Sequence, residues 1–166
     1  IMVHIFTDST SDLSPELIAR YNINVVPLTV HIADRTFHDD FSVSGKELFA
    51  MVDATGQLPT TSAPSVGEFA AAFDRPDEVI YIGISSKLSA SVANARLAAE
   101  TFPAGKVRVI DSLNLSTGAG LLVLRAADLR DQGASAEEIE REVLAAVPKV
   151  RTSFVIDTMR YLYMGG

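Results

Sequence analysis

The stretch EVIYIGISSKLSASVANARLAAE, residues 78–100, contains a strand signal, a polar turn and a helix signal in direct succession. The run Glu78–Ile84 is strongly apolar, which is typical of a buried strand. From Ser89 to Thr101 the chain is rich in alanine, which favours a helix. A strand that leads into a helix is the repeating unit of parallel α/β sheets. Four serines crowd the turn between the two signals: Ser85, Ser86, Ser89 and Ser91.

The same alternation of strand and helix signals runs through the rest of the chain. Further strands are predicted at Val3–Thr7, Asn24–Ile32, Lys106–Ile110 and Thr152–Asp157. Three S-x-x-E capping boxes predict the starts of helices, at Ser44–Glu47, Ser65–Glu68 and Ser135–Glu138. Two more helices are predicted from Ser14-Pro15 to about Tyr21 and over 116–131, and helix C-caps at Gly56 and Gly133. We therefore predict an α/β fold, with a mainly parallel sheet flanked by helices on both faces.

Composition excludes several classes of partner and chemistry. The 166 residues suit one globular domain, or one large domain with an incomplete neighbour. The net charge is −7 without any block of Lys or Arg, which argues against nucleic acid and anionic membrane surfaces. There is no cysteine, so thiol nucleophiles and disulfides are excluded. The sequence has neither a signal-peptide pattern nor an apolar run of about 18 residues, so we expect a cytoplasmic protein without a membrane span.

Polar loops are predicted at the ends of several strands, where open α/β sheets bind ligands. They share a high content of Ser and Thr and contain no His: Thr7–Leu13, Pro59–Ser65, Ser85–Ser91 and Asp111–Gly118. Such residues also cap helices and stabilise turns without any further role. Their convergence on one sheet edge nevertheless favours a site of neutral hydrogen-bond donors. Beside an apolar cavity, that site suits a carboxylate with an apolar tail.

Asp8 suggests a different class of function. It follows the first predicted strand, as in phosphatases that use an aspartyl nucleophile. Those enzymes need a second carboxylate two residues later as general acid, and here that residue is Thr10. We expect Asp8 and Asp12 to cap turns and hold neighbouring loops. An Asp8-dependent phosphatase remains the alternative.

Other catalytic and cofactor sites have little support in the sequence. There is no G-x-S-x-G nucleophile elbow, no P-loop and no G-x-G-x-x-G motif. His4 and His31 lie in strand-like runs, where a structural role is expected. The run His38-Asp39-Asp40 places adjacent residues that splay apart, so it predicts no metal site. We assign no catalytic residue, metal or cofactor.

Five motifs in order resemble the DegV family of fatty-acid-binding proteins. They span nearly the whole chain: TDSTSDL (7–13), VVPLTV (25–30), PTTSAPS (59–65), ISSKLSAS (84–91) and VIDSLNLSTGAG (109–120). The resemblance implies a two-domain, non-catalytic carrier that buries one long-chain fatty acid and in some bacteria presents it to a separate fatty acid kinase subunit. The family's carboxylate contacts map onto Thr61 and Ser89, with Ser62 and Ser91 as second contacts. A binder of another small carboxylate is a further alternative.

The sequence departs from the family pattern at three places. Ala90-Ser91-Val92 replaces Gly-Thr-Tyr, which narrows the room beside the head group. In DTMRYLYMGG (157–166), Arg160 stands where the family has an acid. The sequence ends at Gly166, where the family continues with an Arg and a second domain. We therefore expect residues 1–166 to be an N-terminal domain whose second domain is absent.

Overall fold

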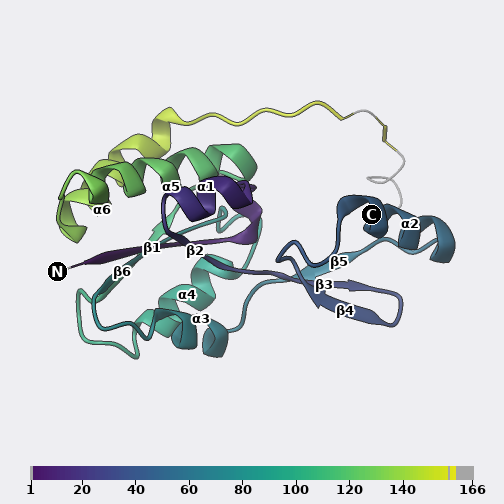
Figure 1. Ribbon diagram of the computed structural model, residues 1–166, viewed down its shortest axis with the longest axis horizontal. Helices are drawn as coiled ribbons and strands as arrows, with labels where there is room; N and C mark the ends of the chain where they lie inside the picture. The colour runs from purple at the N-terminus through teal and green to yellow at the C-terminus, as the bar shows by residue number, and fades with distance from the viewer. Residues whose placement is uncertain (1, 157, 160–166) are drawn as a thin grey trace. The chain divides into compact units, whose positions relative to one another are not determined.

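The chain divides into two structural units in a computed structural model that describes residues 2–156 and 158–159 (Figure 1). Of the described residues, the first unit comprises 2–26 and 63–152. The second comprises 27–62, 153–156 and 158–159. Each unit has its own β-sheet, and we describe each by itself.

A four-stranded parallel sheet forms the centre of the first unit. Its strands are β1 (Val3–Asp8), β2 (Ile23–Val26), β6 (Glu78–Gly83) and β7 (Val107–Asp111). They lie in the order β2-β1-β6-β7, and all three neighbouring pairs are parallel. β6 is buried along almost its whole length, which explains its continuous apolar sequence. The predicted parallel sheet is confirmed.

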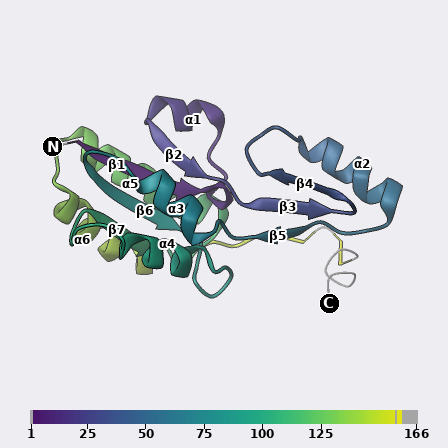
Figure 2. The ribbon, with the colours of Figure 1, turned by 90° about the horizontal axis from the view of Figure 1, so that it is seen from below.

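Helices cover both faces of this sheet, as predicted. Figures 1 and 2 show one layer with α1 (Pro15–Arg20), α5 (Ser116–Asp131) and α6 (Ala136–Ala146). The other layer contains α3 (Val66–Phe73) and α4 (Ser91–Ala99). Each layer has its own apolar core, and Ile5 and Phe6 of β1 alternate between the two. Short 3₁₀ turns, η1 (Ser9–Ser11) and η2 (Val147–Lys149), complete the unit.

All three predicted capping boxes are present. In each box the serine hydroxyl accepts from the glutamate N–H, and the glutamate carboxylate accepts from the serine N–H. The boxes start α3, α6 and α2 (Gly45–Thr55). Gly56 ends α2 with a φ of 66°, and Gly133 follows α5 with a φ of 88°. Both values lie in the left-handed region, where glycine has no steric penalty.

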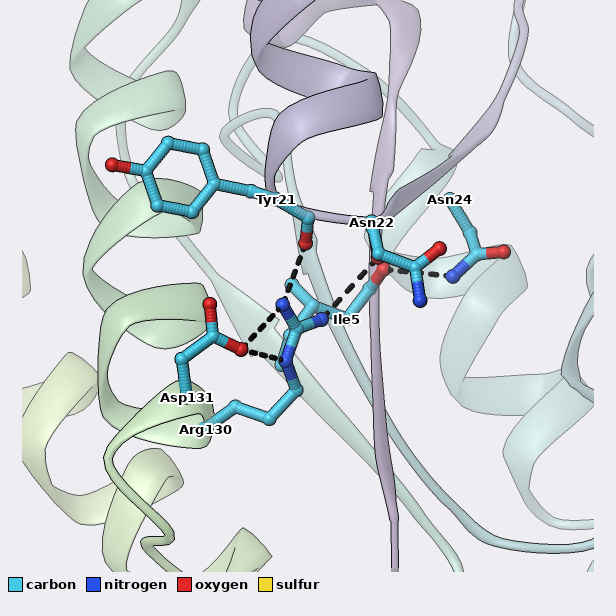
Figure 3. A network of polar contacts seen from close by, with 6 residues as sticks. All are labelled: Ile5, Tyr21, Asn22, Asn24, Arg130 and Asp131. Carbon is cyan, nitrogen blue, oxygen red and sulfur yellow. Dashed lines mark hydrogen bonds and ion pairs between the residues drawn. The ribbon is translucent and has the colours of Figure 1, made fainter.

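A half-buried arginine, Arg130, connects α5 to the turn between α1 and β2 (Figure 3). The Arg130 guanidinium donates to the carbonyl oxygens of Tyr21 at 2.6 Å and Asn22 at 3.3 Å. Asn22 has a φ of 45°, so the chain reverses sharply at this point. Asn24 then donates from its side-chain amide to the Ile5 carbonyl at 3.2 Å. These bonds fix the entry of the chain into β2.

The second unit contains a small antiparallel sheet that sequence analysis did not predict. Its strands are β3 (Thr29–Ile32), β4 (Arg35–His38) and β5 (Thr60–Ser62), in the order β4-β3-β5. The single strand predicted over Asn24–Ile32 is therefore wrong. It breaks after β2, because Pro27 has no N–H to continue the parallel ladder. β3 instead pairs antiparallel with β4 and β5.

The strand predicted at Thr152–Asp157 is also wrong for the residues that the structure describes. Residues 152–156 form no strand, and Asp157 lies outside the described residues. Phe154 and Val155 are 70% and 97% exposed, so their apolar character does not indicate burial in a sheet. Arg160 and the end of its motif lie outside the described residues. Within the described part of the chain, no helix is long and apolar enough to cross a membrane.

Candidate functional site

The carboxyl ends of β6 and β7 bring two of the serine-rich loops together. The Asp111 carboxylate accepts from the N–H of Ser86 at 3.1 Å and from that of Leu113 at 3.0 Å. The Ser85 N–H donates to the Asn114 carbonyl at 2.8 Å. Parallel strands end at the same edge, so β1 delivers Asp8 to this side of the sheet as well. Three of the four predicted polar loops thus meet within the first unit, whereas most of Pro59–Ser65 lies in the second unit.

Asp8 is fully buried and surrounded by four hydrogen-bond donors. One carboxylate oxygen accepts from the N–H of Thr10 at 3.0 Å and from the Thr10 hydroxyl. The other accepts from the Tyr81 hydroxyl at 2.7 Å and from the Ile84 N–H at 3.0 Å. These four bonds fill the acceptor sites of a carboxylate. Thr10, at the position of the phosphatase general acid, holds Asp8 instead, which agrees with the expected structural role.

Tyr81 is the site residue that sequence reasoning missed. It is fully buried in β6, and its ring packs against Phe69 with centroids 5.0 Å apart. Burial, and after it the neighbouring Asp8 carboxylate, raises the pKa of the Tyr81 phenol above its ordinary value. The Ser91 side chain acts in the opposite direction. The phenol therefore stays protonated and donates its proton to Asp8.

Gly83 provides the room for this tyrosine. A Cβ built on Gly83 would lie 2.7 Å from Cε1 of the Tyr81 ring. Real Cβ atoms essentially never come so close, and the ring cannot move aside easily because it is fully buried. The glycine that ends the strand thus permits the Tyr81 phenol to lie along the sheet edge and reach Asp8.

The structure brings two of the predicted contacts, Ser89 and Ser91, together. Their hydroxyl oxygens are 2.9 Å apart, and the Ser91 N–H donates to the Ser89 oxygen at 3.2 Å. Ser91 is the first residue of α4 and is fully buried, whereas Ser89 precedes the helix and is half-buried. The predicted helix start at Ser89 is thus two residues early. Ser89 is the end of this serine pair that a ligand can reach.

The other two predicted contacts, Thr61 and Ser62, are exposed neighbours on β5 in the second unit. Thr61 lies opposite Val30 and Ser62 opposite Thr29 in the antiparallel sheet. The Ser62 hydroxyl is 3.2 Å from Nε2 of His31. Nδ1 of His31 is 3.1 Å from the Thr36 hydroxyl, so this histidine bridges strands, in keeping with a structural role. Among the described residues no cluster of His, Asp or Glu could hold a metal ion.

A family model described as "Uncharacterised protein, DegV family" matches residues 2–166. The chain belongs to the DegV family. A DegV domain-containing protein of Deinococcus radiodurans is 39% identical to it over 168 residues. That alignment covers 99% of this chain and 59% of the relative. The resemblance drawn from the five motifs is confirmed.

Solved structures of DegV proteins share the fold. A DegV family protein from Thermus thermophilus, described by its fatty acid binding, has a TM-score of 0.84 and 37% identity. The match covers 99% of this chain and 60% of that one. The fatty acid kinase B3 protein of Streptococcus pneumoniae, loaded with linoleic acid, has a TM-score of 0.79 and 31% identity over 89% of this chain and 55% of that one. This chain therefore spans less than two thirds of the length of these relatives.

Proposed function

We propose that this DegV protein binds a long-chain fatty acid and holds its acid head group with serine and threonine hydroxyls. The observation that carries the proposal is the Ser89–Ser91 pair, which places a reachable hydroxyl at the carboxyl edge of the sheet. Fatty acid binding by the Thermus and Streptococcus relatives supports the same ligand. Ser89 and Thr61 are proposed as the main contacts, and Ser62 and Ser91 as second contacts.

The proposed role is that of a carrier without catalytic activity of its own. The Streptococcus relative is named as the B3 protein of a fatty acid kinase, which supports presentation of the bound acid to a separate kinase subunit. The chemistry of the first unit agrees with a binding role. Asp8, the one candidate nucleophile from the sequence, already accepts four hydrogen bonds and is fully buried. No observation favours the phosphatase alternative.

The test compares the oleate affinity of matched variants of the natural, complete protein. Thr61→Ala combined with Ser89→Ala removes both proposed main contacts. Two lost hydrogen bonds should weaken oleate binding about 10- to 100-fold in a titration. The control combines Thr60→Ala, next to Thr61 on β5, with Ser86→Ala, three residues before Ser89; both remove exposed hydroxyls. Equal affinities in the two double variants would contradict the assignment. Tight binding of a short carboxylate instead would point to the other small-carboxylate alternative.

A further inference from the structure

We propose that the turn Asp111–Asn114, called the β7 turn because it follows β7, positions Ser89 for the acid head group and is itself held by Thr152. Asp111, Asn114 and Thr152 are therefore positioning residues, which act without touching the ligand. This inference rests on the proposed function, because it concerns the head group of the same ligand.

Ser89 lies in a turn that begins at Ser85 and is held from outside. The Ser85 carbonyl accepts from the Ser89 N–H at 3.2 Å, which closes this serine turn. The Asn114 carbonyl accepts from the Ser85 N–H at 2.8 Å. The Asp111 carboxylate accepts from the Ser86 N–H at 3.1 Å. The place of the Ser89 hydroxyl therefore depends on two bonds from the β7 turn.

The β7 turn has a strained conformation that hydrogen bonds maintain. Leu113 has a φ of 49°, in the left-handed region that leucine rarely adopts. Its side chain is 54% exposed, so burial of the leucine does not account for the strain. The Asp111 carboxylate accepts from the Leu113 N–H at 3.0 Å, and the Ser112 hydroxyl donates to the Asn114 carbonyl at 3.0 Å. Strained residues held in this way are frequent at ligand sites.

The Asn114 side chain connects the β7 turn to a distant part of the chain. Its amide N–H₂ group donates to the Ser112 carbonyl at 3.0 Å and to the Val150 carbonyl at 3.4 Å. Its oxygen accepts from the Thr152 hydroxyl at 2.9 Å. Asn114 is buried, so the loss of a partner leaves a polar group unsatisfied. Asn114 thus contacts the serine turn through its backbone and the end of the first unit through its side chain.

A glycine in α5 leaves the room that Thr152 needs. A Cβ built on Gly118 would overlap the Thr152 hydroxyl and would lie 3.0 Å from the Asn114 side-chain oxygen. The φ of Gly118 is not positive, so the backbone does not require glycine there. Alanine would be the better helix former. The contact between Thr152 and Asn114 accounts for the glycine.

The test compares oleate affinities of variants of the natural, complete protein, titrated well below the melting temperature of each variant. Thr152→Val removes the hydroxyl with little change of shape. It should weaken binding about three- to tenfold, as expected for one lost hydrogen bond. Thr152→Ser keeps a hydroxyl and should restore the wild-type affinity. Thr101→Val, the matched control, removes an exposed hydroxyl two residues after α4 and should bind as the wild type does.

A second pair of variants tests the other side of the β7 turn and decides the case if Thr152→Val does not fold. Asp111→Ala removes the acceptor of the Ser86 N–H, whereas Asp111→Asn keeps an oxygen at the same place. Both variants remove the charge, so the difference between them reports the hydrogen bond. We expect Asp111→Ala to bind oleate about tenfold more weakly than Asp111→Asn.

The possible failures are distinguishable. If Thr152→Val lowers the melting temperature but binds oleate as tightly as Thr152→Ser, the role of Thr152 is purely structural and its part of the inference is wrong. Equal affinities of the two Asp111 variants overturn the role of the β7 turn. Either result leaves fatty acid binding intact. If the wild type binds no oleate at all, the proposed function itself is wrong.

Discussion

The Tyr81 hydroxyl and the Asp8 carboxylate are joined by a 2.7 Å hydrogen bond between two neighbouring parallel strands. In the register of the sheet Tyr81 lies opposite Phe6, so its phenol extends along the strands to reach Asp8 two residues further on. Both residues are fully buried. The bond ties the end of β1 to β6, shortly before the loop that contains Ser89.

Asp8→Asn should destabilise the protein substantially. The amide would direct its N–H₂ group at two of the donors that now bind the carboxylate, leaving buried groups unsatisfied. We expect a loss of about 2–4 kcal/mol in the free energy of unfolding, measured by urea denaturation. Asp12→Asn is the matched control, because Asp12 is exposed and its φ of 51° suits asparagine equally well. A similar small loss in both variants would contradict the assigned role of Asp8.

Gly83→Ala should destabilise through a steric conflict with the Tyr81 ring. The added Cβ would lie 2.7 Å from Cε1 of a ring that is fully buried. Overpacking of this kind costs about 1–3 kcal/mol. Gly67→Ala provides the comparison, since its Cβ would meet only the Ser65 oxygen at 4.0 Å within α3. There the melting temperature should stay constant or rise, because alanine is the better helix former.

Arg130→Lys should loosen the attachment of α5 to the chain reversal before β2. The planar guanidinium reaches the carbonyls of Tyr21 and Asn22 together, which a single ammonium group does less well (Figure 3). The expected loss is about 1–2 kcal/mol in chemical denaturation. The exposed Arg141 pairs with Glu142 at 3.8 Å, so Arg141→Lys should change stability by less than about 0.5 kcal/mol. If Arg130→Lys lowers the free energy of unfolding by no more than Arg141→Lys does, the hydrogen bonds from Arg130 to Tyr21 and Asn22 do not stabilise the fold measurably.

Two of the capping boxes predict a loss of stability in acid. Hydrogen bonds from the Ser44 side chain and backbone hold the pKa of Glu47 below its ordinary value of 4.5. The Ser135 backbone and side chain do the same for Glu138. Because the folded-state pKa is the lower one, the stabilisation is complete above pH 4.5 and disappears as the pH falls through the folded-state values.

Urea midpoints measured from neutral pH down to about pH 3 test this dependence. The Glu47→Gln/Glu138→Gln variant should lose less stability in acid than the wild type, because it has fewer groups to protonate. Glu137→Gln alters an exposed neighbour of Glu138 and serves as the control. If the urea midpoints of the double variant and the wild type fall equally as the pH is lowered, this explanation is wrong.

Local sequence signals predicted the helices and the parallel sheet well, because they arise from short-range chemistry. The serine–glutamate boxes and the two C-terminal glycines depend on backbone groups within one turn of the helix. The antiparallel sheet was missed for a different reason. Asn24–Ile32 has continuous strand composition, and only long-range pairing separates the part beside β1 from the part beside β5. Strand composition alone does not identify the partner.

The candidate site was predicted in part for a similar reason. The serine-rich loop was visible as hydroxyls at a strand end, and the resemblance to the DegV family then singled out Ser89 and Ser91 within it. Tyr81 could not, since a tyrosine within Glu78–Gly83 is read as part of an apolar strand. The sequence signal that could have indicated Tyr81 is its position two residues before Gly83, beside a parallel strand that ends in Asp8. That neighbour relationship becomes known only when the strand order is known.

Mass spectrometry of the purified protein, before and after extraction with organic solvent, tests the central claim most directly. For the natural, complete protein we predict one long-chain fatty acid per chain in the native spectrum. The same acid should appear in the extract. The Thr61→Ala/Ser89→Ala variant should contain less of it than the Thr60→Ala/Ser86→Ala control. An extract without fatty acid, together with a melting temperature that added oleate and palmitate leave unchanged, would contradict the proposal.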